Sequence, residues 1–252
     1  MKELEKLLSP VRRACEHYGM IEAGDLIVVG LSGGKDSMAL LYALAAMRRF
    51  YPVPYELAGV CIDLGFPDTD GLFAPLEAFC RTLGVSCRIE KTEIAPIVFE
   101  GKREKNPCSL CAKMRRGALT DAVREMGGTK LALGHHLDDA AETFLLSLFE
   151  DGRIGSFSPV TVYEDRGISV IRPLVYAREY EISALVRAAG LPVVKSPCPE
   201  DGNTARAEMR ELMKTLGKTH RGLPEKLIGA LERRGIDGWS DKPVSPPDGN
   251  CP

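Results

Sequence analysis

Six residues, Ser32-Gly33-Gly34-Lys35-Asp36-Ser37, follow directly after a short apolar run. Glycines let backbone N–H groups approach an anion closely, while two serine hydroxyls and the ammonium of Lys35 add further donors. This combination predicts a phosphate-binding turn, against the alternative of a plain strand-to-helix connection. Asp36 beside phosphates would repel them unless a divalent cation intervened, so it is a candidate Mg²⁺ ligand. The segment therefore predicts binding of ATP with Mg²⁺.

Two common nucleotide motifs do not fit this segment. A Walker A loop requires a glycine where Val29 stands and a hydroxyl residue where Asp36 stands. The spacing is not that of GxGxxG either, which disfavours a dinucleotide cofactor.

A second polar segment, Gly134-His135-His136-Leu137-Asp138-Asp139, begins where another predicted strand passes into a helix. The carboxyl ends of parallel strands meet at one edge of a sheet, so this segment is expected near the glycine turn. Its acids have an alternative role as helix caps, which accounts well for Asp138. That role does not explain two histidines and two aspartates together.

Three cysteines form a third candidate site. Cys108 and Cys111 open a predicted helix as a CxxC pair, and Cys198 stands between two prolines that restrict its loop. Four interpretations remain open: a redox pair, half of a zinc site, ligands of an iron–sulfur cluster, and incidental thiols. Three thiolates on a cluster would leave one iron open to a substrate or a sulfide.

Composition limits the class of protein. The chain has 252 residues, a net charge of −2 and eight cysteines, which is typical of a globular protein without a disulfide framework. No apolar run approaches the roughly 18 residues of a membrane span, and the first residues do not resemble a signal peptide. A cytoplasmic location without membrane contact is expected.

Alternating strand and helix patterns predict an α/β fold with a doubly wound parallel sheet and a mostly helical C-terminal region. Strands are expected at 26–31, 56–62, 85–89 and 130–133, and a hairpin at 160–163 and 169–171. Helices are expected at 1–18, 38–47, 75–83, 109–126, 138–149, 178–189, 204–216 and 222–234. The predicted divisions are an N-terminal helix at 1–23, a nucleotide-binding domain at 24–200, a helical extension at 201–241 and a disordered tail at 242–252.

Basic residues gather in two regions of an otherwise neutral chain. Residues 101–120 carry a net charge of +5, from Lys102, Arg103, Lys105, Lys113, Arg115 and Arg116 against Glu104. Arg206, Arg210 and Lys214 share one face of a predicted helix. Such surfaces suit RNA phosphates, although a solvated helix face explains the second region as well. Arg115, one turn after Cys111, is a candidate for stabilising charge on a reacting phosphate.

The glycine turn resembles the PP-loop of the ATP pyrophosphatase superfamily, whose members split ATP between the α- and β-phosphates. The resemblance implies adenylation of an acceptor, with the adenine near Ile62, Asp63, Gly134 and His135. The second segment resembles the GHHxDD signature of PP-loop enzymes that modify tRNA, which implies that Asp139 is the functional acid.

Residues 24–200, with CSLCAKMRRG, VIRPL and Cys198, resemble the tRNA 2-thiocytidine synthetase family. This resemblance implies a 4Fe–4S cluster on Cys108, Cys111 and Cys198. It also implies that ATP activates the C2 oxygen of a cytidine in a tRNA and that sulfur replaces that oxygen. The implied partners are tRNA and a sulfur donor, either sulfide or a cysteine desulfurase, and a homodimer is possible. This chain departs from the family after Cys198, where Pro199-Glu200-Asp201-Gly202 stands in place of the second cysteine expected in many members.

Two other functions remain open at this point. One is a PP-loop ligase that adenylates another acceptor and keeps the cysteines as a structural zinc site. The other is a nucleotide and redox sensor in which Cys108 and Cys111 cycle between thiol and disulfide.

Overall fold

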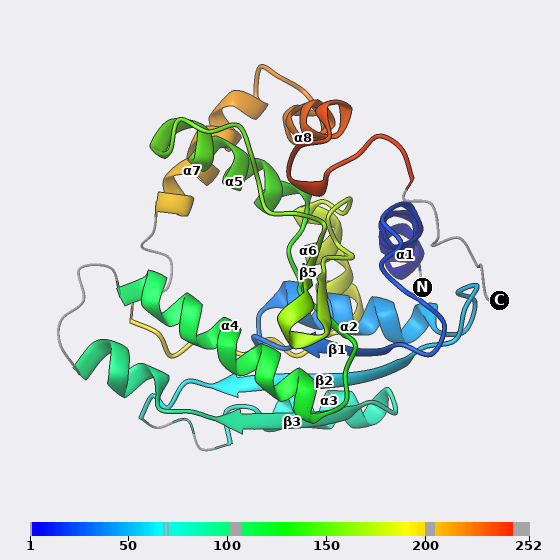
Figure 1. The fold of residues 1–252 in the computed structure, drawn as a ribbon, viewed down its shortest axis with the longest axis vertical. Helices are drawn as coiled ribbons and strands as arrows, with labels where there is room; N and C mark the ends of the chain where they lie inside the picture. Colours follow the sequence, from blue (N-terminus) through cyan, green and yellow to red (C-terminus); the bar gives the residue numbers. More distant parts are fainter. Residues whose placement is uncertain (1, 68, 70, 101–106, 200–204, 244–252) are drawn as a thin grey trace.

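The computed structural model describes residues 2–67, 69, 71–100, 107–199 and 205–243. Its strands form a six-stranded sheet in the order β3-β2-β1-β4-β6-β5. Figure 1 shows β1, β2 and β3 lying side by side in this sheet. The strands are β1 Leu26–Gly30, β2 Glu56–Asp63, β3 Ser86–Lys91, β4 Lys130–Ala132, β5 Val160–Tyr163 and β6 Ile168–Ile171. All neighbours pair in parallel except β5 and β6. The prediction of a doubly wound, mostly parallel α/β sheet is confirmed.

The predicted hairpin is present as β5 and β6, but the structure also places it in the main sheet. β6 pairs in parallel with β4, with Leu131 opposite Val170. Ile168, Val170 and Ile171 are buried, whereas Val162 of the edge strand β5 is 63% exposed. A strand that is apolar on both faces is stable only when both are covered, which explains why β6 lies inside the sheet and β5 at its edge.

The described helices lie within a few residues of the predicted ones. They are α1 Lys2–His17, α2 Lys35–Met47, α3 Ala74–Thr82, α4 Pro107–Glu125, α5 Leu137–Glu150, α6 Glu179–Ala189, α7 Ala205–Gly217 and α8 Leu223–Arg234. A π-helical turn at Pro96–Glu100 and two 3₁₀ turns at Glu164–Arg166 and Ile236–Gly238 were not predicted.

The sheet separates two hydrophobic cores. Alternate residues of β1 point to opposite faces, so Ile27 and Val29 pack with α1, α2, α3 and α6, while Val28 packs with α4 and the π-helical turn. The two-sided burial makes β1 a rigid base for the segment that follows it.

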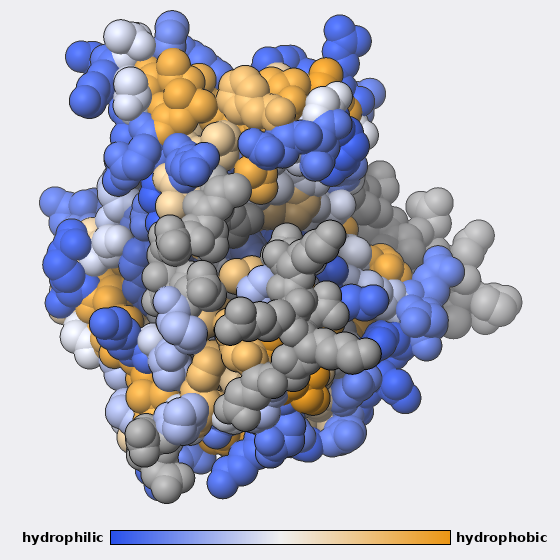
Figure 2. Space-filling view, turned by 90° about the vertical axis from the view of Figure 1, so that its left-hand side faces the viewer, coloured by the Kyte–Doolittle hydropathy of each residue, from blue (hydrophilic) through white to orange (hydrophobic). Residues whose placement is uncertain are grey.

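The C-terminal helices gather at one end of the molecule, where α7 and α8 pack on α5 (Figure 1). Trp239 is fully buried, and its Nε1 donates a hydrogen bond to the Phe157 carbonyl at 2.9 Å. The chain is thus anchored almost to the end of its described part; residues 244–252 of the predicted tail lie outside it. Figure 2 shows hydrophobic residues gathered over this helical end, with hydrophilic residues along the flanks. In the described ranges, no helix combines the length and the hydrophobicity that crossing a bilayer requires.

Candidate functional site

One cavity of about 550 Å³ lies at the carboxyl edge of the sheet, where β1, β2, β4 and β6 end. It is lined by residues from all three sequence motifs: Ser32, Asp36, Ser37, Ile62, Cys108, Cys111, Arg115, Gly134, His135, Asp139 and Cys198. The fold therefore brings together the predicted phosphate turn, the predicted acid and the predicted cluster ligands.

Four predicted nucleotide-binding residues do not line this cavity. Val194 N donates to the Gly33 carbonyl at 2.9 Å and covers that glycine, and Gly34 lies beside it in the turn. The Asp63 carboxylate accepts from Gly65 N at 3.0 Å, which is the arrangement of a turn cap. Lys35 is the fourth, and its ammonium group is already paired.

Lys35 Nζ lies 2.8 Å from Asp36 Oδ1 and 3.1 Å from Glu179 Oε1. Burial alone would lower the pKa of Lys35, but the hydrogen bonds and charges of these two acids outweigh it and raise the pKa. Lys35 thus carries a positive charge at the start of α2 and ties this turn to α6.

The glycine turn leads into α2 without a side-chain cap on the first N–H groups of that helix. Gly33 has φ +80°, a left-handed conformation that favours glycine, and Gly34 occupies the N-cap of α2 without any side-chain cap. Ser37 Oγ donates to the Gly34 carbonyl at 2.9 Å, and Gly34 N donates to Ser32 Oγ at 3.2 Å. A helix that begins without a capping side chain leaves N–H groups available to an anion, which fits a phosphate site.

Sequence reasoning missed His136, which is buried with 2% exposure at the N-cap of α5. The ring Nδ1 of His136 accepts a hydrogen bond from the backbone N of Asp139 at 3.3 Å. The backbone N of His136 donates to Asp139 Oδ2 at 3.0 Å. Because Nδ1 is the acceptor, the neutral ring carries its proton on Nε2, which lies 3.5 Å from Asp139 Oδ2. The signal available in the sequence was an acid three residues after the cap position, the spacing of a capping box.

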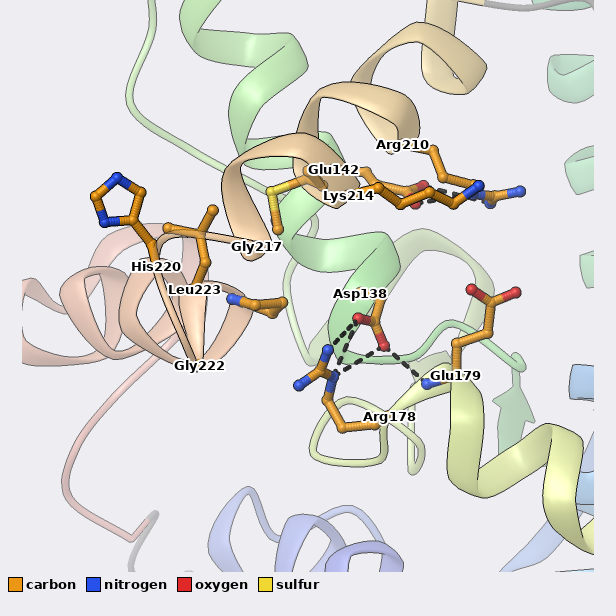
Figure 3. A pocket seen from close by; sticks show the side chains of 12 residues that line it. Asp138, Glu142, Arg178, Glu179, Arg210, Lys214, Gly217, His220, Gly222 and Leu223 are labelled. Atoms are coloured by element: carbon orange, nitrogen blue, oxygen red, sulfur yellow. Dashed lines mark hydrogen bonds and ion pairs between the residues drawn. The ribbon is translucent and has the colours of Figure 1, made fainter.

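Asp138 and Asp139 are adjacent in sequence but serve different places. Asp139 lines the main cavity, whereas Asp138 accepts from Arg178 Nε at 3.0 Å and from Glu179 N at 2.7 Å (Figure 3). Asp138 is therefore a helix cap, as the alternative interpretation held, but it caps α6 and not its own helix.

Gly134 has a packing reason for being glycine. A Cβ at this position would lie 3.0 Å from the Asp36 carbonyl carbon and from Ser37 N. The segment after β4 thus touches the backbone at the start of α2, which fixes the two motifs against one another.

The three cysteine thiols are free and lie along the same cavity; Cys108 is exposed, and Cys111 and Cys198 are half-buried. Burial raises the pKa of Cys111, the nearby Cys198 and Cys108 raise it further, and Arg115 opposes them. In the part of the chain that the structure describes, no three metal-binding side chains gather tightly around one point. A multi-iron cluster binds its thiolates on different irons, so three soft donors around an open volume fit it better than a closed zinc site.

The predicted basic regions differ in what the structure makes of them. Arg115 and Arg116 line the main cavity. Lys102, Arg103 and Lys105 lie outside the described residues, as does the side chain of Arg206.

Arg210 and Lys214 line a second cavity of about 230 Å³ between α5, α7 and α8 (Figure 3). Arg210 Nε lies 2.9 Å from the buried carboxylate of Glu142, and Lys214 Nζ lies 2.6 Å from Glu211. Arg210 therefore joins α7 to α5 and Lys214 pairs within α7, so both charges are already compensated within the protein.

Comparisons with known proteins agree with this geometry. Residues 3–216 match the PP-loop domain family. The tRNA-cytidine(32) 2-sulfurtransferase of Syntrophotalea carbinolica is 41% identical over 87% of this chain and 85% of its own length, and that of Geobacter metallireducens is 39% identical over 91% and 90%. Among solved structures, the U34-tRNA thiolase NcsA of Methanococcus maripaludis with its [4Fe-4S] cluster superimposes with a TM-score of 0.75. It is 25% identical, with 92% of this chain and 78% of that chain covered.

Proposed function

The chain belongs to the PP-loop family and, within it, to the family of the tRNA-cytidine(32) 2-sulfurtransferases, and from this premise we propose that it is an ATP-dependent tRNA sulfurtransferase. The reaction adenylates the C2 oxygen of a cytidine in tRNA and replaces that oxygen with sulfur. The observation that carries the proposal is one cavity lined by the glycine turn, Asp139 and the cysteines 108, 111 and 198.

The two half-reactions belong in one cavity because a carbonyl oxygen is a poor leaving group. The C2 oxygen attacks the α-phosphorus of ATP and pyrophosphate leaves. Sulfide then attacks C2, the C2–O bond breaks, and AMP departs with the original oxygen. The products are a 2-thiocytidine in the tRNA, AMP and pyrophosphate.

The protein's own residues have distinct roles in this proposal. Ser32, Ser37 and the open N–H groups of α2 bind the phosphates, and the guanidinium of Arg115 stabilises charge that develops on the α-phosphate. Asp36 and Asp139 line the same cavity, and their carboxylates are the groups that would hold Mg²⁺. Ile62 in β2 and His135 after β4 flank the glycine turn in the same cavity and would contact the adenine.

Cys108, Cys111 and Cys198 would hold the 4Fe–4S cluster, which when bound supplies an iron free of protein thiolate to carry the incoming sulfur. The proposed sulfur source is sulfide or a cysteine desulfurase. We further propose a cytoplasmic location, with a homodimer as the assembly. In this proposal residues 24–200 form the catalytic domain, residues 1–23 and 201–241 are helical additions, and residues 242–252 are a tail.

The test uses anaerobically reconstituted protein, ATP, sulfide and tRNA lacking thiolation, with mass spectrometry of nucleosides and a pyrophosphate assay. The wild type is expected to form 2-thiocytidine and to release pyrophosphate only with tRNA. Asp36→Asn should abolish both products and keep the iron content, while Asp165→Asn, on an exposed carboxylate away from the cavity, should match the wild type. Colourless protein with bound zinc would favour the ligase, and the absence of RNA-dependent pyrophosphate release would favour the sensor.

A further inference from the structure

Arg172, directly after β6, is a cavity residue that the reaction described above does not use. Its Nη1 donates to the Ser158 carbonyl at 2.6 Å and to Thr161 Oγ1 at 3.1 Å. The guanidinium lies 5.2 Å from the centre of the Phe157 ring. All of these contacts are with neutral groups.

No carboxylate in the described ranges forms an ion pair with Arg172, and its Nε is shielded from solvent without a hydrogen-bond partner. Two other arginines at cavities of this protein are arranged differently, because Arg178 pairs with Asp138 and Arg210 pairs with Glu142. Leaving a buried charge unpaired is costly, so an arginine kept in this state in a cavity is suited to an anion that arrives from outside.

Burial lowers the pKa of Arg172 to about 10, with a smaller contribution in the same direction from Arg116. The side chain therefore stays protonated at neutral pH. Arg116 also lines the cavity, so two guanidinium groups from different elements share this wall.

The position of Arg172 in the sheet separates it from Ile62, one of the residues assigned to adenine. The strand order places β2, which ends near Ile62, on one side of β1, and β4 followed by β6 on the other. Arg172 thus lies across the glycine turn from Ile62 and on the same side as His135, which follows β4 and packs against the same Phe157 ring.

We propose that Arg172 is a phosphate-binding residue of the cavity and that it positions a substrate phosphate for the reaction. The phosphate belongs either to ATP or to the tRNA backbone beside the target nucleotide. The inference rests on the proposed function, because both phosphates are those of its substrates. A planar guanidinium can donate two parallel hydrogen bonds to a phosphate, which an ammonium group cannot reproduce.

The experiment measures dissociation constants of α,β-methylene-ATP by calorimetry and of an unmodified tRNA transcript by filter binding. The proteins are the wild type, Arg172→Gln, Arg172→Lys and the control Arg166→Gln. Arg166 lies on the same hairpin but pairs with Asp121 outside the cavity, so its removal changes the net charge equally. If ATP supplies the phosphate, Arg172→Gln should weaken the nucleotide at least about tenfold and leave tRNA binding unchanged.

If the tRNA supplies the phosphate, nucleotide binding should stay constant and the slope of log Kd against log salt should fall by about 0.7 to 0.9, the value for one phosphate contact. If Arg172 only fastens Ser158 to the hairpin, Arg172→Gln should lower the Tm without changing the dissociation constant of the nucleotide or the salt dependence of tRNA binding. That result would overturn the proposal. Arg172→Lys keeps the charge, so it provides the binding measurement if the glutamine variant does not fold. A wild type that binds neither substrate would refute the proposed function itself, which is a different outcome.

Discussion

Nε2 of His136 lies 3.8 Å from Oδ1 of Asp36, joining two motifs that are about a hundred residues apart in the chain. The same nitrogen lies 3.5 Å from Asp139 Oδ2. His136 therefore lies between the two carboxylates of the cavity, where its Nε2–H faces both and reduces their mutual repulsion. We interpret it as a positioning residue for the acids.

Replacing His136 with asparagine separates this role from helix capping. Asparagine is a good N-cap, so His136→Asn should keep α5 and change the Tm little, while His136→Ala should also lose about 1 kcal/mol of capping energy. Pyrophosphate release by His136→Asn should fall about tenfold or more, because the Nε2–H that reduces the repulsion between the two carboxylates is lost. Thermal unfolding and the pyrophosphate assay measure the two effects. A wild-type rate in the asparagine variant would show that the His136 Nε2–H is not needed for the reaction.

Gly134→Ala tests the contact between the two motifs. Its Cβ would lie 3.0 Å from backbone atoms of Asp36 and Ser37, which cannot move aside as a flexible side chain can. We expect a lower Tm and weaker binding of α,β-methylene-ATP. The control is Gly117→Ala in α4, where a Cβ meets nothing within 4 Å and alanine should stabilise the helix by roughly 0.5 to 1 kcal/mol. Equal nucleotide affinity in both variants would contradict the assignment.

Cys198→Ser tests the third cluster ligand. The variant should lose iron and the formation of 2-thiocytidine but bind α,β-methylene-ATP as the wild type does, because Cys198 is not part of the glycine turn. Cys87→Ser is the matched control, since Cys87 is also partly exposed but does not line the cavity. Iron analysis of anaerobically reconstituted protein distinguishes the two, and full iron content with thiolation in Cys198→Ser would remove this cysteine from the ligand set.

The pKa of Cys111 predicts how the metal-free protein reacts with iodoacetamide. Burial and the neighbouring thiols raise this pKa, and only the thiolate reacts, so alkylation of Cys111 should be slow at neutral pH and should still increase above pH 9, the ordinary value for a thiol. Arg115 lowers the pKa, so Arg115→Gln should slow alkylation at pH 8. Mass spectrometry of the peptide containing Cys111 follows the rate. Faster alkylation in Arg115→Gln would contradict the assigned electrostatics.

Local features of the chain were predictable because their cause is local. The apolar run before Ser32, the paired glycines and the CxxC spacing act through backbone conformation and short-range geometry, and they identified the strand, the turn and the helix that carries the thiols. The alternation of such units predicted the mostly parallel sheet and, through it, the edge at which the motifs meet.

The tertiary structure decided what depends on contacts between distant segments. Adjacent aspartates 138 and 139 face different cavities because Arg178 and Glu179, far along the chain, supply the partners of the first one. His136 lies between two carboxylates because α2 and α5 begin side by side. Arg172 has no acidic partner in the described structure because of the place of β6 in the sheet. The types of residue were set by the sequence, but their partners, and therefore their charges and roles, were set by the packing of the strands.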